Sequence, residues 1–237
     1  MALPKIDTPI FTLKLPSSNG KKNIKFRPFT VREEKILLMA AQGEGEEEEA
    51  LDSIKQVINN CLHTEIDIND LPTYDIEYIF VNLRARSVNN VIELTLTDDE
   101  DEQTYNVPVN IDDIEVVFNE DHKYVIELND SISIQLKDPN YNMVQKLASY
   151  KQDDEGMMEM VISSIDKVLV GEDDVLLMKD HTRKEQEEFV NSLSSQNMRD
   201  IEKFLSTLPK LTHTIEYARE DGTKVEKVIE GMQSFFT

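Results

Sequence analysis

Short β-prone runs and turn signals fill the first thirty residues. Two runs, Ile10 to Leu15 and Asn23 to Phe29, flank a turn-forming cluster from Pro16 to Gly20. Strand-like runs on either side of such a cluster predict a β-hairpin. Pro28 lacks a backbone N–H and cannot donate to a strand ladder, so the second strand should end there.

Helical spacing replaces this pattern from Thr30 onward. Thr30 and Glu33 have the spacing of a capping box, which predicts a helix that continues to about Ala41. After a glycine-bearing acidic run, apolar residues recur three and four positions apart in two further segments, which predicts two amphipathic helices that pack against each other. The apolar positions are Leu51, Ile54, Val57, Ile58, Cys61 and Leu62 in the first segment, and Ile76, Ile79, Phe80 and Leu83 in the second.

The apolar period changes to two in the middle of the chain. Alternation of this kind, interrupted by short acidic turns, predicts antiparallel strands with one buried face. The strands should form a small central β-sheet. The alternating segments are residues 91–97, 105–109, 114–118, 124–128 and 131–136.

Helical signals return in the last hundred residues. Asp138 and Pro139 suit a helix start, and a long apolar face then runs from Met158 to Leu169. Thr182 and Glu185 form a second capping box, and another helix should end at Pro209. The chain should close with a hairpin of two strands, residues 212–218 and 223–229, followed by Phe235 and Phe236 as an apolar terminal plug.

These patterns together predict an α+β protein. We expect three consecutive sections: an N-terminal hairpin with helices (residues 1–90), a central antiparallel β part (91–137), and C-terminal helices closed by a β-hairpin (138–237). Their strand order does not follow from the pattern.

The charge distribution is uneven. The chain of 237 residues has a formal net charge of −22, yet residues 1–39 hold eight basic against three acidic residues. Eleven acidic residues and no Lys or Arg lie between Ser87 and His122, and we call this segment the acidic block. Nonspecific binding to nucleic acid is not expected, because such affinity comes from cations that neutralise phosphates. A small cationic surface on an anionic body favours oriented association with other macromolecules, including further copies of the same chain.

The sequence offers no recognisable catalytic or cofactor chemistry. The four histidines are scattered outside metal-binding spacings, and the seven glycines form no phosphate-binding loop. Cys61, the single cysteine, continues an apolar helical stripe and suits a buried position in a reducing cytoplasm. Neither a secretory signal nor an apolar run of membrane-spanning length is recognisable. We therefore expect a protein that is not an enzyme and holds no metal or cofactor.

Arg84 and Arg86 end the otherwise apolar helix that precedes the acidic block. Two interpretations stay open for them. Cations in the last turn of a helix complement the helix dipole, and the same side chains could pair with carboxylates of the acidic block or of a partner.

Three segments resemble a known family. LPSSNGKKNIKFRPFTVREEKILLMA near the N-terminus, LPTYDIEYIFVNLRARSVN in the middle and GMQSFF at the end are similar to the baseplate hub assembly proteins of T-even-type contractile-tailed bacteriophages. The resemblance implies a non-enzymatic protein, made in the cytoplasm of the infected bacterium, that helps to build the central hub of the tail baseplate. It would act as a chaperone or as a hub component that stays in the virion baseplate, and its partners would be other hub or tape-measure proteins.

The candidate partner-binding residues lie in three places along the chain. They are the basic and aromatic residues of the N-terminal hairpin, the two arginines at the helix end and the terminal aromatics. An alternative function is an acidic DNA mimic that inhibits a host nucleic-acid-binding protein, because the acidic block could imitate phosphates. The candidates are Lys21, Lys22, Lys25, Arg27, Phe29, Arg84, Arg86, Phe235 and Phe236.

Overall fold

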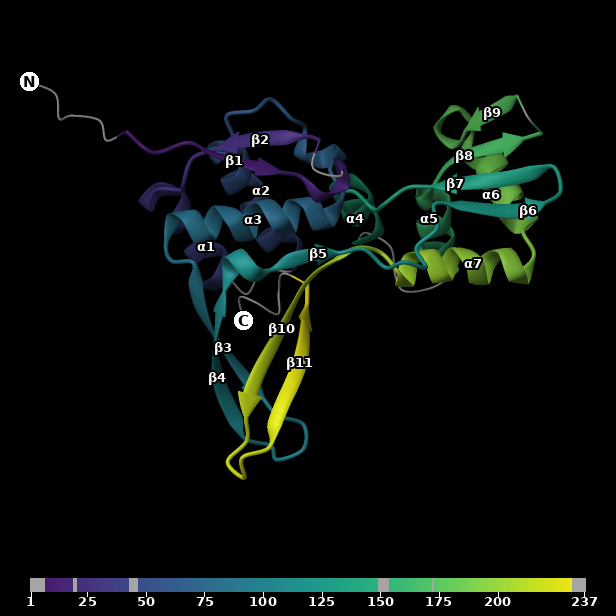
Figure 1. Cartoon of the computed structure of the whole chain (residues 1–237). Helices are drawn as coiled ribbons and strands as arrows, with labels where there is room; N and C mark the ends of the chain where they lie inside the picture. The colour runs from purple at the N-terminus through teal and green to yellow at the C-terminus, as the bar shows by residue number, and fades with distance from the viewer. Residues whose placement is uncertain (1–6, 19–20, 43–46, 149–153, 172, 232–237) are drawn as a thin grey trace, which may run out of the picture. The chain divides into compact units, whose positions relative to one another are not determined.

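The computed structural model of the chain describes residues 7–18, 21–42, 47–148, 154–171 and 173–231. It divides into two compact units (Figure 1). Unit 1 comprises residues 1–68, 74–117 and 210–237, and unit 2 comprises residues 69–73 and 118–209. The chain therefore leaves unit 1 after Val117, builds most of unit 2, and returns to unit 1 with its last strands.

Unit 1 begins with the predicted hairpin. Strand β1 (Phe11–Lys14) pairs antiparallel with β2 (Asn23–Phe26), and Phe11 lies opposite Phe26. Alternate side chains of β2, Ile24 and Phe26, are buried, as the two-residue period of a half-buried strand requires. The second strand ends just before Arg27 and Pro28, in agreement with the expected effect of the proline.

Three helices follow in unit 1: α1 (Val31–Gln42), α2 (Glu47–Cys61) and α3 (Thr73–Ser87). The carboxylate of Glu33 accepts a hydrogen bond from the backbone N–H of Thr30 at 2.8 Å, which confirms the predicted interaction at the start of α1. Within the stripes predicted for α2 and α3, the buried side chains include Val57 and Ile58 in α2 and Ile79 and Leu83 in α3.

Two long hairpins lie side by side and extend away from these helices (Figure 1). One is formed by β3 (Val91–Thr97) and β4 (Thr104–Asn110), the other by β10 (Lys210–Ala218) and β11 (Lys224–Glu230). We call these four strands the hairpin arm. Strand β5 (Glu115–Val117) pairs with the start of β10 at its base. Apolar side chains from both hairpins are buried, namely Ile92, Leu94, Val107, Val109, Ile215 and Ile229.

Unit 2 is built around a four-stranded antiparallel sheet. Its order is β6 (Val125–Asn129), β7 (Ile132–Leu136), β8 (Ile165–Val170) and β9 (Asp174–Leu177). The helices of the unit are α4 (Tyr141–Ala148), α5 (Asp154–Ser164), α6 (Arg183–Asn191) and α7 (Ser195–Ser206). The predicted capping box of Thr182 and Glu185 opens α6. Helix and sheet side chains share one buried apolar cluster that includes Ile134, Ile165, Ile201 and Phe204.

The α+β class is confirmed, but the apolar face from Met158 to Leu169 is not one helix. Helix α5 ends at Ser164, and Ile165 begins β8. Strand β8 is paired along both of its edges, by β7 and β9, and its buried residues, Ile165 and Val168, lie three positions apart. A short apolar run of this kind cannot be told from a buried helical segment by periodicity alone. The partner strand β9 was not predicted.

The strands predicted for the central sheet are all present as antiparallel strands, distributed over three sheets. β3 and β4 pair with each other, β5 pairs with β10, and β6 and β7 join β8 and β9. Side-chain alternation shows which face of a strand is buried but does not identify the strand with which it pairs. Two of the partner strands, β8 and β10, come from later parts of the chain.

Among the helices that the structure describes, none combines the length and apolarity needed to cross a membrane.

Candidate protein-interaction surfaces

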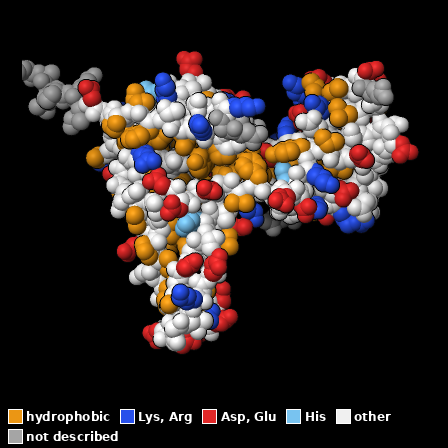
Figure 2. All heavy atoms as spheres, viewed as in Figure 1, with side chains coloured by type: hydrophobic (Ala, Val, Ile, Leu, Met, Phe, Trp, Pro, Cys, Tyr) orange, Lys and Arg blue, Asp and Glu red, His pale blue; other side chains and the backbone are white. Residues whose placement is uncertain are grey.

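The lysines of the N-terminal hairpin are exposed on a firmly attached backbone. Lys21, Lys22 and Lys25 are all exposed. The backbone N–H of Lys25 donates to Thr64 Oγ1 at 2.8 Å, and its carbonyl accepts from the N–H of His63 at 2.8 Å. On the face drawn in Figure 2, basic side chains gather over the part of unit 1 that contains β1 and β2, whereas acidic ones predominate on the hairpin arm. The sequence therefore identified a positive surface that the fold presents to solvent.

Arg27 differs from these lysines because its guanidinium binds groups within unit 1. It forms an ion pair with Glu33 at 3.1 Å and donates to the backbone carbonyl of Asn60 at 3.0 Å. Burial of Glu33 raises the pKa of its carboxyl, but hydrogen bonds from Arg27 and Thr30 outweigh that effect and lower the pKa to about 2. Arg27 thus joins β2, the start of α1 and the end of α2.

Phe29 is partly buried in the connection between β2 and α1. Its backbone N–H donates to Ser87 Oγ at 2.9 Å, and the Ser87 hydroxyl in turn donates to the carbonyl of Leu83. This chain of hydrogen bonds fixes the connection to the last turn of α3. Phe29 therefore positions the hairpin and offers a partner only part of its ring.

For Arg86, both interpretations that the sequence left open are correct: it lies at a helix end and it pairs with a carboxylate of the acidic block. It lies in the last turn of α3, where a cation complements the helix dipole, and it pairs with Asp112 of the acidic block at 2.9 Å. Its guanidinium carbon also lies 5.6 Å from the centre of the Phe11 ring. Arg84 is partly buried, and burial lowers the pKa of its guanidinium. Phe235 and Phe236 lie outside the described residues.

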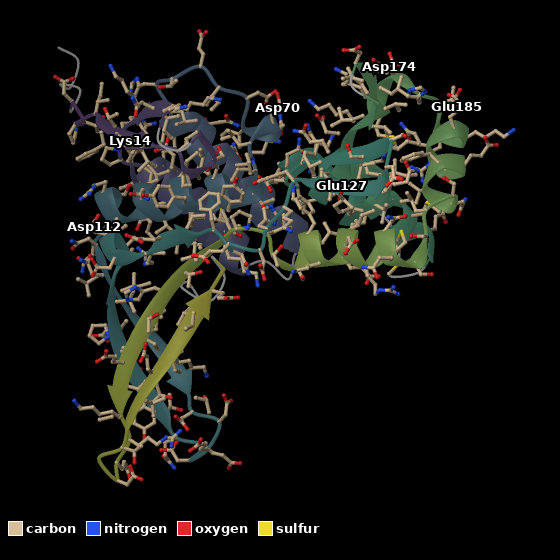
Figure 3. The ribbon with its side chains drawn as sticks, turned by 45° about the vertical axis from the view of Figure 1, so that its right-hand side comes forward. Lys14, Asp70, Asp112, Glu127, Asp174 and Glu185 are labelled. Atoms are coloured by element: carbon tan, nitrogen blue, oxygen red, sulfur yellow. The ribbon has the colours of Figure 1, made fainter. Side chains whose placement is uncertain are left out.

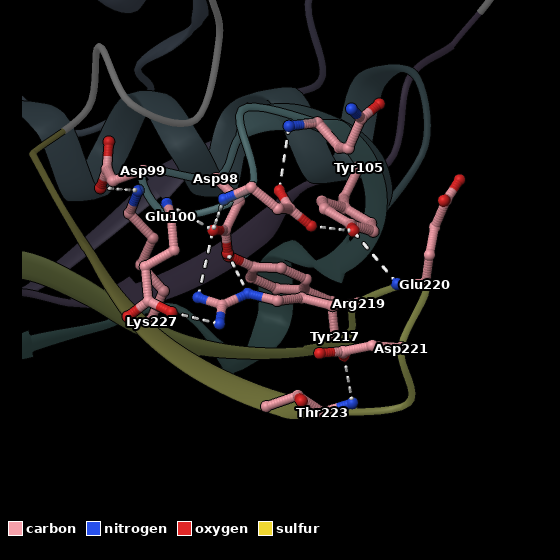
Figure 4. Close-up of polar contacts among 12 residues, drawn as sticks. Asp98, Asp99, Glu100, Tyr105, Tyr217, Arg219, Glu220, Asp221, Thr223 and Lys227 are labelled. Carbon is pink, nitrogen blue, oxygen red and sulfur yellow. Dashed lines mark hydrogen bonds and ion pairs between the residues drawn. The ribbon is translucent and has the colours of Figure 1, made fainter.

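A polar network that was not predicted from the sequence joins the two hairpins of the arm (Figure 4). Asp98, whose side chain is only 2% exposed, accepts hydrogen bonds from the hydroxyl of Tyr217 and from the Arg219 guanidinium at 3.1 Å. The backbone N–H of Glu100 also donates to Asp98 at 2.9 Å. The rings of Tyr105 and Tyr217 pack with their centres 4.9 Å apart.

These contacts alter the proton affinities of the groups in the network. The hydrogen bond from Tyr217 is the strongest influence on Asp98, and with the Arg219 contact it holds the pKa of that carboxyl well below its usual range. The same bond raises the pKa of Tyr217 to about 12. Asp98 is therefore a carboxylate and Tyr217 a neutral phenol at neutral pH, which is the pairing that their hydrogen bond requires.

The network also shows where part of the acidic block finds its counter-charges. Arg219 pairs with Glu100 as well as Asp98, and Lys227 lies 3.4 Å from Asp99. These cations come from β11 and from the segment that follows β10, more than a hundred residues later in the chain. Sequence composition alone could not have matched the two segments, because residues 219–227 contain as many acidic as basic residues.

Cys61 has the environment of an unreactive thiol. Burial raises the pKa of the Cys61 thiol to about 11, which keeps it protonated and weakly nucleophilic at neutral pH. Within the ranges that the structure describes, no group of three or more His, Cys, Asp or Glu side chains is arranged to hold a metal ion.

A model of the T4 bacteriophage base plate protein family matches residues 8–237. The chain belongs to this family. No curated protein and no solved structure gave a significant match. The family match spans both units, so the hairpin arm and the sheet of unit 2 both lie within the matched region.

Proposed function

We propose that this T4 base plate family protein promotes formation of the central hub of the baseplate, as a chaperone or as a hub component, without catalysing a chemical reaction. The observation that carries the proposal is the family match over residues 8–237. The partners would be other hub or tape-measure proteins, met in the cytoplasm of the infected host during assembly. If the protein stays in the hub, it would also be found in the virion baseplate.

The N-terminal hairpin supports a role in docking. Its lysines are exposed, while Arg27 and the backbone around Lys25 and Phe29 are held by internal hydrogen bonds. A cationic surface with a fixed backbone loses little conformational freedom on binding. On a chain of net charge −22, it would orient the approach of an acidic partner surface. Association of one copy with the anionic surface of another would use the same attraction.

The alternative function, an acidic DNA mimic, has weaker physical support. Mimicry requires carboxylates that face a partner with the charge and spacing of phosphates. In the acidic block, Asp98, Glu100 and Asp112 pair with arginines of the same chain, and Asp99 pairs with Lys227. These carboxylates hold the hairpin arm together, which leaves fewer of them to imitate a duplex.

Co-expression with the hub and tape-measure proteins of the same phage tests the proposal. We expect at least one of them to co-purify with this chain and to become less soluble when the chain is omitted. If none co-purifies and their solubility does not change, the proposed function is wrong. Recovery of host nucleases or polymerases in the same purification would favour the DNA mimic.

A further inference from the structure

The outer edge of the sheet in unit 2 borders a groove. Strand β6 lies at one edge of the sheet and β9 at the other, as Glu127 and Asp174 mark in Figure 3. The groove beside β6 has a volume of about 520 Å³, and helix α7 forms its opposite wall. Its lining includes Val125, Ile126 and Glu127 from β6 and Asp200, Lys203 and Phe204 from α7.

The hydrogen-bond register shows which backbone groups of β6 face this groove. The N–H of Leu136 donates to the carbonyl of Tyr124 at 2.7 Å, and Ile126 lies opposite Ile134. In an antiparallel pair, residues alternate between bonding to the partner strand and facing away from it. Tyr124 and Ile126 therefore face β7, and the N–H and carbonyl groups of Val125 and Glu127 point outward. Among the described strands, β6 pairs only with β7.

Aromatic and polar contacts hold the two walls of the groove together. The ring of His122, just before β6, stacks on Phe204 of α7 with centres 4.5 Å apart. His122 Nδ1 also lies 3.0 Å from Thr207 Oγ1. An ion pair of 3.6 Å joins Asp121 to Lys203. The groove is thus preorganised, and a bound segment would not have to open it.

The chemistry of the lining indicates what would fit. Val125 is 47% exposed, which gives the strand an apolar side chain at the groove. Lys123 and Lys203 line the end where β6 begins, and Lys203 pairs there with Asp121. Asp200 lies one helical turn earlier on α7, and Glu127 lies further along β6, so these two acidic residues belong to the opposite end. Exposed main-chain groups on an edge strand are a template for another strand.

We propose that the groove between β6 and α7 binds an extended segment of another tail protein as an added β-strand, with apolar residues beside Val125 and a basic side chain beside Glu127 and Asp200. The proposal rests on the proposed function for the source of the segment. The register of β6 shifts between Glu127 and Asn129, which limits the ladder to a few residues. The groove therefore suits a short peptide segment rather than a second whole sheet.

Two substitutions at one position separate the backbone contribution from the charge. Glu127→Pro removes an outward N–H without removing a hydrogen bond between β6 and β7, and proline is tolerated at such edge positions. Glu127→Thr removes the same carboxylate but keeps the N–H. Circular dichroism and thermal unfolding of both variants show whether unit 2 keeps its fold.

The probe is an array of short overlapping peptides that cover the hub and tape-measure proteins of the same phage, incubated with the full-length chain. We expect the wild type to bind apolar peptides that carry a basic residue. Glu127→Pro should bind the best of them at least about tenfold more weakly, as expected for a lost main-chain hydrogen bond and the disturbed strand next to it. Glu127→Thr should lose less affinity and should discriminate less between basic and neutral peptides.

Amide exchange gives a second measurement that does not depend on how the proline variant folds. In the wild type, the best peptide should slow exchange at Val125 and Glu127, with little change at Ile126, which already faces β7. Equal binding by Glu127→Pro and wild type, unchanged exchange at the outward amides, or a preference for acidic peptides would each overturn the inference. If no peptide binds while a hub protein still co-purifies with the chain, the groove proposal fails and the proposed function stands.

Discussion

The hairpin arm of unit 1 and the sheet of unit 2 are stabilised by different interactions. In unit 2, helices and strands share one buried apolar cluster that contains Ile134, Ile201 and Phe204. In the arm, two hairpins face each other across fewer apolar side chains, and ion pairs and tyrosine hydrogen bonds link their far ends. Apolar burial should therefore dominate the stability of unit 2, whereas the arm should depend on charge and on pH.

Unit 2 also contains a buried charge, which sharpens the comparison. Glu159 is fully buried and accepts hydrogen bonds from Arg183 and from the hydroxyl of Ser163 at 2.7 Å, and its carboxylate also pairs with Lys146. Burial alone would raise the pKa of the Glu159 carboxyl, but the contacts of Glu159 with Lys146 and Ser163 outweigh that effect and lower the pKa. The difference between the regions is thus one of proportion: unit 2 combines the buried Glu159 with a large apolar cluster, and the arm has fewer buried apolar side chains and ion pairs at its end.

The largest expected effect is in the core of unit 2. Ile201→Ala removes a side chain that is 0% exposed, and such a truncation costs about 3 kcal/mol through lost apolar contact and the cavity left behind. Urea unfolding followed by circular dichroism measures the change. The control Leu176→Ala alters a side chain on β9 that is 44% exposed, and it should change the free energy of unfolding by less than about 1 kcal/mol. Equal effects would contradict the proposed role of the apolar core.

The next effect is local to the arm. Arg219→Met leaves Asp98 buried without its ion-pair partner, so we expect faster amide exchange in β3, β4, β10 and β11 and no change in β6 to β9. Lys227→Met removes a cation that pairs with the exposed Asp99, and it should have a smaller effect. Faster exchange in both units would show that the arm is not an independent local structure.

The pH dependence of the arm follows from the shifted pKa values. The pKa of Asp98 is lower in the folded protein than in the unfolded chain, so its contribution to stability is present above the ordinary aspartate pKa of about 4 and is lost as the pH falls through the lower folded value. Tyr217 behaves in the opposite way. Its contribution is complete below the ordinary tyrosine pKa of about 10 and is lost as the pH rises through its folded pKa of about 12.

Ultraviolet titration of the phenol groups checks the alkaline part of this prediction. The wild type should contain one more late-titrating tyrosine than Tyr217→Phe. Identical titration curves would show that the hydrogen bond between Tyr217 and Asp98 does not form in solution.

The smallest effect on stability should come from the hairpin lysines. Replacing Lys21, Lys22 and Lys25 by Glu changes only exposed side chains, so each should alter the free energy of unfolding by about 0.5 kcal/mol or less. The same triple variant should lose binding to an acidic partner. Lys184→Glu on α6, also exposed, is the control, and equal loss of binding by both would show that the position of the charge does not matter.

Local patterns predicted the elements that depend on neighbouring residues. The N-terminal hairpin, the capped starts of α1 and α6 and the buried stripes of α2 and α3 all follow from spacing and turn chemistry. β8 was missed because its two buried residues, Ile165 and Val168, lie three positions apart and continue the helical spacing of the segment before it. The pairing of β5 with β10 was not predictable because it depends on contacts between distant segments.

The candidate interaction residues divide in the same way. The exposure of Lys21, Lys22 and Lys25 followed from their place near a turn. The ion pair between Arg27 and Glu33 could not be predicted in this way. The sequence pattern identified Glu33 only as a capping residue. The burial of Glu33, which requires a counter-charge such as Arg27, depends on how α2 packs. The network of Asp98, Tyr217 and Arg219 was invisible for a similar reason, since it joins segments more than a hundred residues apart.

Cross-linking in infected cells, read by mass spectrometry, tests most directly whether the protein acts by contact with other tail proteins. With a lysine-reactive cross-linker, we expect links from Lys21, Lys22 or Lys25 to a hub or tape-measure protein. When these three lysines become Glu, links from the neighbouring Lys14 and Lys35 to the same protein should also become weaker. Links from Lys227, which lies beside Asp99 of the acidic block, to host nucleic-acid-binding proteins, with none from the hairpin to a tail protein, would contradict the account.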